Sequence, residues 1–423
     1  MEFKVIIAQT KKYELVSIIL FGLISLISED LGIFLFGFIS ILFMSLLNKK
    51  GKIEEDSYKY FIISYLIYLV FAIIIYYAQL YIYGSPFFEG ANDDLYYYER
   101  IIKLVENYNI NYFFNPNDPA VADYSLGSFN IYQTGYEFII GTIGVVFNLI
   151  SPNSGIFYYI INSFFGAITI LLIYKIILEA TNNTNIAQFS TLFAMIYPHM
   201  IFYSGTLLKD VLVTLIIAIL TYLFVFKRKK YSTLINTILG FIFFYFLMTL
   251  RFRIAIVVFM LIIICSIAPK YKKINLKIIK NKPIYIYILF VIGLVFVAVS
   301  GMLEKIIDYV INAKQYYFNK ISSLNGLTTL VLEFPPIIIN IVVFCIIFIM
   351  PFSFWSSFSS PIGTLIRNIF MDIGTLYWLL LLPFAFIGII ENYKNENYNN
   401  GLFIFVIGLV GAMSMALTMQ IRW

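Results

Sequence analysis

Runs of about twenty apolar residues recur along the chain and constrain its fold more than any other feature. A helix of about that length crosses the hydrocarbon core of a bilayer, and inside the bilayer it satisfies its own backbone hydrogen bonds. The composition agrees, because 61% of the 423 residues are hydrophobic and only 12% are charged, whereas soluble domains are about 25% charged. The sequence therefore predicts an all-α, polytopic integral membrane protein.

We expect about 11 to 13 membrane helices in a single membrane domain that covers residues 1–423. Two polar stretches, residues 84–134 and 302–334, are predicted to be extracytoplasmic loops, and the first is large and carries short helices. The apolar runs lie at residues 15–28, 31–47, 60–83, 136–150, 155–178, 187–203, 207–226, 234–250, 254–268, 284–301, 335–350, 373–390 and 402–419.

Lysine-rich loops indicate which face of the membrane is cytoplasmic. Lysines cluster at residues 49–52, 227–230 and 270–282, and cytoplasmic loops of membrane proteins carry an excess of Lys and Arg. Because this pattern accounts for the formal net charge of +6, we expect no nucleic-acid partner. Residues 60–83 then cross outward, so the loop 84–134 is extracytoplasmic.

The run 136–150 does not fit a simple count of crossings. It has fifteen residues, which is short for a crossing, and the basic segment 227–230 would lie outside if every later run crossed. We therefore expect the run 136–150 to be re-entrant, interfacial or half-buried. Residues 203–210 and 249–253 then lie on the same outer face as the loop 84–134.

Two adjacent carboxylates, Asp93 and Asp94, follow the third apolar run in the sequence ANDDLYYYER. Ionisable residues at a membrane are costly and mark functional sites by default. One carboxylate could be a general base, because like charges this close raise one pKa. The pair could instead bind a divalent cation such as Mg²⁺ or Mn²⁺, with Tyr97 and Tyr98 as a platform for a sugar ring. Alternatively, one Asp caps a helix and the other is solvated.

The segment after the acidic pair predicts an interfacial helix. Its apolar residues Leu95, Tyr98, Ile102 and Val105 recur at helical spacing and would form one face. The acidic pair would then stand at the start of this helix.

A second charged position is Lys209–Asp210, which opens an apolar helix at the end of the sequence YPHMIFYSGTLLKD. Lys209 could face an anionic group, and Asp210 could complete an acidic cluster with the pair in the first loop. The simpler alternative is a local ion pair in which Asp210 stabilises the helix N-terminus.

Arginine is used sparingly, at six positions against 23 lysines. A guanidinium binds phosphate through two parallel hydrogen bonds, which an ammonium cannot do. We therefore expect Arg251, Arg253 and Arg367, which lie outside the lysine-rich loops, to hold an anionic group. Snorkelling at the membrane interface is the alternative explanation.

The only histidine, His199, and the two cysteines, Cys265 and Cys345, lie within apolar runs. Neither a histidine-based metal site nor a Ser-His-Asp triad is supported, and no disulfide framework is expected.

The order of these features resembles that of the GT-C superfamily of membrane glycosyltransferases, which use polyprenyl-phosphate-linked sugars. The acidic pair followed by Tyr, the helix start YPHMIFYSGTLLKD, and the segments LRFR, MPFSFW, LYWLLLLPF and IRW resemble successive segments of bacterial family-39-like members, many of them in surface-polysaccharide biosynthesis. The resemblance implies that Asp93 or Asp94 is the catalytic or metal-binding acid and Asp210 a second outer-face acid. It also implies that Arg251 and Arg422 lie beside the lipid phosphate.

We therefore expect a multi-pass glycosyltransferase of the cytoplasmic membrane whose active site faces the extracytoplasmic side. Its partners would be a polyprenyl-(di)phosphate-linked sugar donor, a glycan or lipid-linked acceptor and membrane lipids. Asp93 or Asp94 would deprotonate the acceptor hydroxyl, directly or through a divalent cation. Arg251, Arg253 and Lys209 would stabilise the departing phosphate.

Two other functions fit the same features. A repeat-unit polysaccharide polymerase of the O-antigen or capsule type would use the same chemistry with a longer acceptor. A transporter or flippase of lipid-linked glycans should instead carry ionisable residues near the bilayer midplane and show inverted repeats. The charges of this chain concentrate at the ends of its apolar runs and no repeat is visible, which favours an enzyme.

Overall fold

The computed structural model describes residues 2–87, 93–107, 134–223, 233–267 and 365–394, and all the elements within these ranges are helices. This confirms the all-α prediction for the described part of the chain. The predicted loop 302–334 lies outside it, as does most of the loop 84–134. The helices are α1 (Glu2–Ser28), α2 (Leu31–Lys49), α3 (Glu55–Tyr83), α4 (Asp93–Asn107), α6 (Thr134–Asn148), α7 (Gly155–Thr181), α8 (Thr184–Met195), α9 (Pro198–Ser204), α10 (Asp210–Thr221), α11 (Thr233–Ile267) and α16 (Leu365–Lys394).

Four helices in the described ranges are long and apolar enough to cross a membrane, namely α2, α3, α7 and the Leu365–Phe384 part of α16. Helices α6 and α10 are also apolar, but they have only 15 and 12 residues. At 1.5 Å per residue they extend about 22 and 18 Å, less than the ~30 Å hydrocarbon core. The described part of the chain is therefore a set of largely apolar helices, several of which are candidate membrane spans.

The contacts between residues divide the chain into two compact units. One unit comprises residues 1–256 and 352–399, and the other comprises residues 257–351 and 400–423. The candidate site described below lies within the first unit. A single membrane domain over the whole chain stays a prediction.

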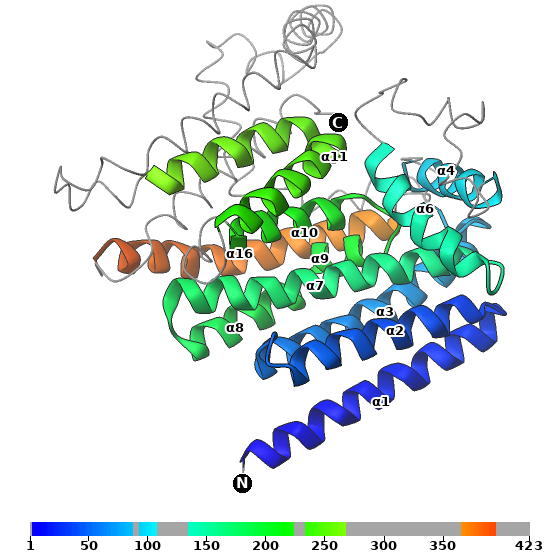
Figure 1. The fold of residues 1–423 in the computed structure, drawn as a ribbon, viewed down its shortest axis with the longest axis horizontal. Helices are drawn as coiled ribbons and strands as arrows, with labels where there is room; N and C mark the ends of the chain where they lie inside the picture. The colour runs from blue at the N-terminus through cyan, green and yellow to red at the C-terminus, as the bar shows by residue number, and fades with distance from the viewer. Residues whose placement is uncertain (1, 88–92, 108–133, 224–232, 268–364, 395–423) are drawn as a thin grey trace, which may run out of the picture. The chain divides into compact units, whose positions relative to one another are not determined.

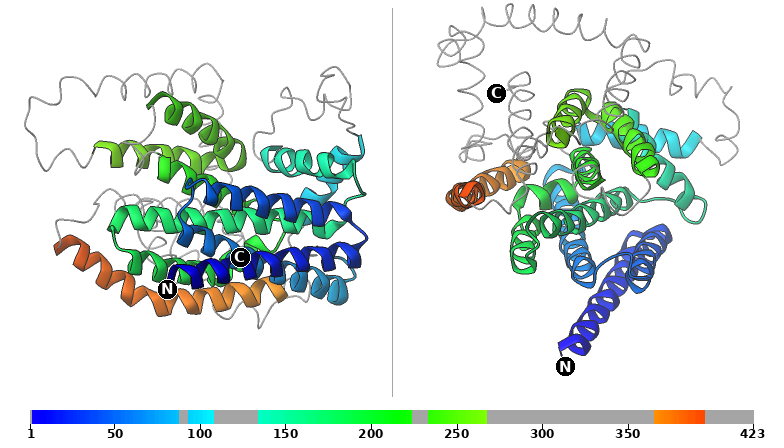
Figure 2. Two further views of the ribbon diagram at one scale, coloured as in Figure 1. Left: turned by 60° about the horizontal axis from the view of Figure 1, so that its bottom comes forward. Right: turned by 60° about the vertical axis from the view of Figure 1, so that its left-hand side comes forward.

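Helices α2, α3 and α7 lie side by side at the centre of the first unit (Figure 1). Helices α3 and α7 run in opposite directions. Near the start of α7, the Tyr159 hydroxyl donates to the carbonyl of Pro86, which follows α3, at 2.5 Å. Near the end of α7, Tyr174 donates to Asp56 at the start of α3 at 3.3 Å. Helices α8, α9 and α10 also pack against α7, whereas α4 and α6 pair with each other at one end of this bundle (Figure 2).

Aromatic rings fill the contact between the central helices. Phe36 of α2 meets Phe157 and Phe164 of α7 edge-on, with ring centroids 5.9 and 5.7 Å apart. Phe61 and Tyr65 of α3 contact Phe164 as well. Such ring pairs add about 0.5–1.5 kcal/mol each beyond the burial of their area. Part of the high Phe and Tyr content therefore packs these helices together.

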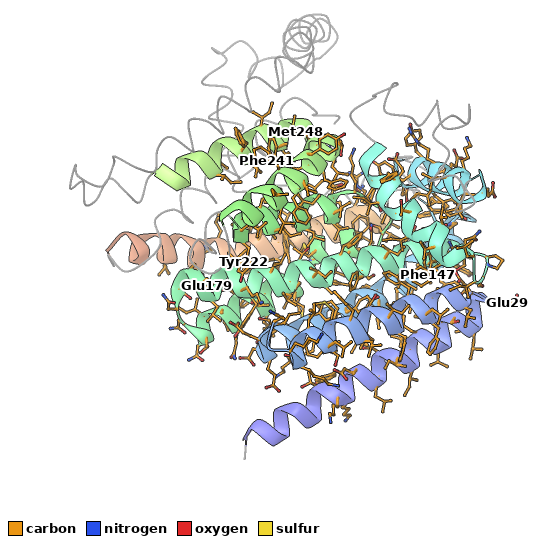
Figure 3. All side chains as sticks on the ribbon, in the orientation of Figure 1. Glu29, Phe147, Glu179, Tyr222, Phe241 and Met248 are labelled. Atoms are coloured by element: carbon orange, nitrogen blue, oxygen red, sulfur yellow. The ribbon has the colours of Figure 1, made fainter. Side chains whose placement is uncertain are left out.

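Asp30 ties the start of α2 to the start of α7. It caps α2 by accepting a hydrogen bond from the Gly32 N–H at 2.9 Å. Its other carboxylate oxygen accepts from the Ser154 N–H at 2.7 Å and from the Ser154 hydroxyl at 2.9 Å. The neighbouring Glu29 makes the turn with a left-handed φ of 54° and points away from the helices (Figure 3). A fully buried carboxylate is thus satisfied by donors from two helix starts.

Helix α6 lies at the end of the bundle where α7 begins. Just before α7, the Asn153 side-chain amide donates to the carbonyl of Gly144 at 2.6 Å, and Phe147 packs on Phe157. At the opposite end of α6, Tyr136 lies beside Asn162 of α7. Both ends of α6 therefore lie next to the first half of α7. Whether the run 136–150 crosses the membrane stays a prediction.

One predicted run differs from the observed helices. The run 187–203 is divided into α8 and α9, because Pro198 lacks a backbone N–H and disfavours a helical conformation at the residue before it; Tyr197 is indeed extended, with φ −63° and ψ 121°. The predicted runs 234–250 and 254–268 instead match the two parts of α11, which meet at a kink where Arg251 has a non-helical backbone (φ −151°, ψ 79°). The kink at Arg251 adjoins the candidate site.

Selective labelling of single cysteines tests the placement of α6. In a protein with Cys265 and Cys345 replaced by alanine, Ser151→Cys should react with a membrane-impermeant maleimide from the same side as Glu99→Cys of α4. Lys50→Cys, in the turn between α2 and α3 that adjoins the end of α7, should react only from the other side. Labelling of Ser151→Cys from the side of Lys50→Cys would show that α6 crosses the membrane.

Candidate functional site

The connection between α9 and α10 is held by polar side chains of α7. The side-chain amide of Asn162 donates to the carbonyls of Thr206 and Leu208 at 2.6 and 3.0 Å. The Ser163 hydroxyl lies 3.1 Å from the carbonyl of Ser204, the last residue of α9, and donates to it. Residues 205–208 are not helical, and α7 supplies donors to the carbonyls of Thr206 and Leu208 among them. This fixes where α10 begins.

Lys209 and Asp210 stand at that fixed point. Lys209 immediately precedes α10 and is 7% exposed. Asp210 is the first residue of α10, and its Oδ1 accepts a hydrogen bond from the Arg251 guanidinium at 3.0 Å. Both side chains of this ion pair are partly exposed, at 38% and 31%. The break of α11 at Arg251 therefore faces the start of α10, and two predicted site residues are brought together.

Helix α4 brings the first loop to the same place. The Lys209 ammonium lies over the ring of Tyr97, 5.7 Å from its centroid. Tyr97 is 2% exposed and packs on Tyr136 of α6, with ring centroids 5.1 Å apart. Tyr136 in turn lies within electrostatic range of Asp210, and Tyr97 within that of Arg251. The two buried rings are thus the centre around which the charged residues gather.

Asp94 lies at the edge of this group and is fully buried. Its Oδ1 accepts a hydrogen bond from the N–H of Leu95 at 3.0 Å. It is within electrostatic range of Tyr159 of α7, which is itself close to Tyr136. We refer to Asp94, Lys209, Asp210 and Arg251, together with the ion pair of Arg100 in α4 and Glu137 in α6, as the charged cluster. It joins two predicted acids and two predicted cations with a pair of charges that were not predicted.

The buried face of α4 differs from the predicted one. It is formed by Asp94, Tyr97, Ile101, Leu104 and Val105. The predicted face included Val105 correctly, but Leu95, Tyr98 and Ile102 are only half-buried. The reason is the packing partner, because two glycines of α6, Gly141 and Gly144, lie directly against Leu104 and Val105. Close helix contact, rather than hydrophobicity alone, selected the face.

Tyr97 and Tyr98 do not form one shared platform. Adjacent helical residues point about 100° apart, and Tyr98 contacts Phe87 and Tyr158 instead, at centroid distances of 4.6 and 6.0 Å. Tyr97 is buried under Lys209, as described above. A sugar-binding role for either ring stays a prediction.

An acid that sequence reasoning missed, Glu137, lies within the charged cluster. Its Oε1 is 3.6 Å from the Arg100 Nε, and the Glu137 side chain is 3% exposed. Arg100 also donates to the Tyr96 hydroxyl. Two features of the sequence could have indicated this pair. Glu137 is a lone carboxylate near the start of the apolar run 136–150, and Arg100, one of only six arginines, lies three residues after Tyr97.

The other predicted site residues are described only in part. Asp93 begins α4 and Arg253 belongs to α11, but neither side chain is among the described ones, and Arg422 lies outside the described residues. Arg367, in the first turn of α16, is within electrostatic range of Tyr203, as are Asp210 and Arg251. Among the residues that the structure describes, no three His, Cys, Asp or Glu side chains gather in a group that could hold a metal ion. A cation held by Asp93 and Asp94 stays a prediction.

Comparisons of the chain with protein-family models, with curated proteins and with solved structures give no significant match.

The role of Asn162 can be tested by Asn162→Leu, which keeps the shape of the side chain but removes its amide. We expect destabilisation by about 1–3 kcal/mol for each carbonyl that loses its donor, measured as a lower unfolding temperature of the purified protein in detergent. Thr169→Val is the matched control, because Thr169 is equally buried in α7 and bonds only to Phe165 of its own helix. Similar unfolding temperatures for the two variants would contradict the role of Asn162.

Proposed function

We propose that this protein is a multi-pass glycosyltransferase of the GT-C type in the cytoplasmic membrane. It would move a sugar or oligosaccharide from a polyprenyl-(di)phosphate-linked donor to a glycan or lipid-linked acceptor at the extracytoplasmic face, in cell-surface glycan assembly. One observation carries the proposal. Asp94 of α4, Lys209 before α10 and the Asp210–Arg251 pair gather around Tyr97 and Tyr136 at one end of the bundle.

The proposed reaction needs a proton acceptor and stabilisation of a phosphate leaving group. A carboxylate, with Asp94 as the first candidate, removes the proton of the acceptor hydroxyl. The hydroxyl oxygen then bonds to the anomeric carbon of the donor sugar, and the bond from that carbon to the phosphate oxygen breaks. The electron pair leaves with the phosphate, whose growing negative charge is stabilised by Lys209 and Arg251. Acids and cations are both present in the charged cluster.

One observation favours the transporter alternative. Asp372 is 6% exposed within the Leu365–Phe384 candidate span of α16, and a buried carboxylate in a span is typical of ion-coupled carriers. In a transporter, the residues around Tyr97 would bind the glycan lipid without breaking a bond. A repeat-unit polymerase would instead share the proposed chemistry and produce long chains. The length of the glycan product distinguishes the polymerase from transfer of a single unit.

Asp94→Asn tests the proposed base. Asn keeps an oxygen for the Leu95 N–H but cannot accept the acceptor's proton, so transfer should fall by roughly 10²-fold or more. The measurement is incorporation of labelled sugar into glycan by membranes that contain equal amounts of each variant. Asp93→Asn, as a cap or metal ligand, should lose less. Glu106→Gln, on an exposed position of the same helix, should retain full transfer. Normal transfer by both single Asp variants and by the double variant would reject this site.

Arg251→Lys tests whether a guanidinium is needed at the break of α11. Lysine keeps the positive charge beside Asp210 but cannot form two parallel hydrogen bonds to a phosphate. Donor binding should weaken by about 1–3 kcal/mol, measured as a higher donor concentration for half-maximal transfer. Arg228→Lys in the predicted cytoplasmic basic segment is the matched control. Unchanged transfer by Arg251→Lys at limiting donor would indicate that Arg251 only occupies the membrane interface.

A further inference from the structure

Glu137 is a buried anion with incomplete compensation. Its side chain is 3% exposed, and neither carboxylate oxygen has a hydrogen-bond partner on another residue. The ion pair with Arg100 spans 3.6 Å, which is too long for a hydrogen bond. A buried ion pair offsets the cost of leaving water only when its geometry is good and its remaining lone pairs are satisfied. The charged form of Glu137 is therefore weakly held.

The groups around Glu137 are mainly cationic or neutral. Arg100 approaches it from α4, and Lys209 approaches it from the α9–α10 connection, while the neighbouring Tyr136 packs on the neutral ring of Tyr97. Burial raises the pKa of Glu137 by more than Arg100, Lys209 and its own backbone N–H lower it. The carboxylate therefore takes up a proton more readily than an exposed glutamate does.

Two further charges, Asp210 and Arg251, adjoin the same rings from α10 and α11, and Asp94 approaches through Tyr159 of α7. The Asp210–Arg251 pair differs in kind from the Glu137–Arg100 pair. It is hydrogen-bonded at 3.0 Å and both its partners reach solvent. Of the two ion pairs, the Glu137–Arg100 pair is therefore the one whose buried carboxylate lacks a hydrogen bond to its partner.

We propose that an anionic phosphodiester group binds beside Arg100 and Lys209 in exchange for the negative charge of Glu137, which takes up one proton from solvent as the group binds. This inference rests on the proposed function, because the donor there is a phosphate-linked lipid. Arg100 is the point of first contact, since 21% of its side chain is exposed. The net charge of the site is therefore the same before and after binding. Arg100 and Lys209 face the Glu137 carboxylate in the free site, and they face the phosphodiester, beside a neutral Glu137, in the occupied site.

The exchange has a consequence for pH dependence. The free site loses the proton on Glu137 as pH rises through the pKa of that carboxyl, whereas the occupied site keeps it. Because one proton is bound with each phosphodiester, affinity falls as pH rises, by at most about tenfold per pH unit. Glutamine at position 137 is always neutral, so it should remove this dependence.

The test uses the purified full-length protein in detergent and farnesyl methyl phosphate as the probe. This diester lacks the second ionisation, near pH 6, of a phosphate monoester, so its own charge stays constant. Titration calorimetry between about pH 5 and pH 8 should show wild-type affinity falling with pH. Glu137→Gln should bind more tightly at the upper end of this range and without pH dependence. Glu99→Gln, an exposed acid of α4, is the matched control and should follow the wild type.

A Glu137→Gln variant that keeps the wild-type pH dependence would overturn the exchange. If that variant fails to fold, the wild type decides the question, because titrations in two buffers of different ionisation enthalpy count the protons taken up. Binding without proton uptake, or no binding of the diester, would also overturn it. Failure of the proposed function is seen separately, when Asp94→Asn, Asp93→Asn and the double variant all transfer sugar normally although the diester binds with proton uptake.

Discussion

The connection between α9 and α10 depends on hydrogen bonds from α7, and most of the candidate site depends on that connection. In an apolar bundle, a carbonyl without a donor costs several kcal/mol, so a helix can stop there only where a neighbour supplies donors. Asn162 and Ser163 do so for Thr206, Leu208 and Ser204. This satisfied break brings Lys209 and Asp210 to the start of α10, where they reach groups of α4, α6 and α11.

The charges that meet there restrain one another. Burying a single charge is prohibitively costly, whereas a paired charge in a medium of low dielectric interacts strongly with its partners. Lys209 lies over Tyr97, Asp210 bonds Arg251, and Glu137 faces Arg100. A site for a phosphate-linked substrate needs cations that are held in place before the substrate arrives, because fixed charges require no reorganisation during the reaction. The hydrogen bond to Asp210 holds Arg251 in this way, and Lys209 is held over the ring of Tyr97.

The sequence predicted the helices and several of the site residues, but not the site's centre. Apolar runs anticipated the central helices but not the division of the run 187–203 at Pro198. Scarce charge anticipated Asp94, Lys209 and Arg251. The scarcity of charge did not indicate Glu137, because only the fold shows that this glutamate faces Arg100 of another helix. The buried face of α4 differs from the predicted face for a related reason. Gly141 and Gly144, which lie against Leu104 and Val105, are about forty residues further along the chain. The hydrophobic periodicity of α4 carries no information about them.

The orientation of α7 links this geometry to the proposed function. Asp30 contacts Ser154 at the start of α7, whereas the Lys175 ammonium near its end donates to the carbonyl of Lys52 at 3.4 Å. Residues 154 and 175 are about 30 Å apart along a helix, close to the thickness of a hydrocarbon core. The charged cluster and the lysine-rich turn therefore lie toward opposite ends of α7. If that turn is cytoplasmic, the cluster faces outward, and a donor that reaches it must carry its sugar on a lipid already at the outer leaflet. A soluble cytoplasmic sugar nucleotide would meet the wrong end of the bundle.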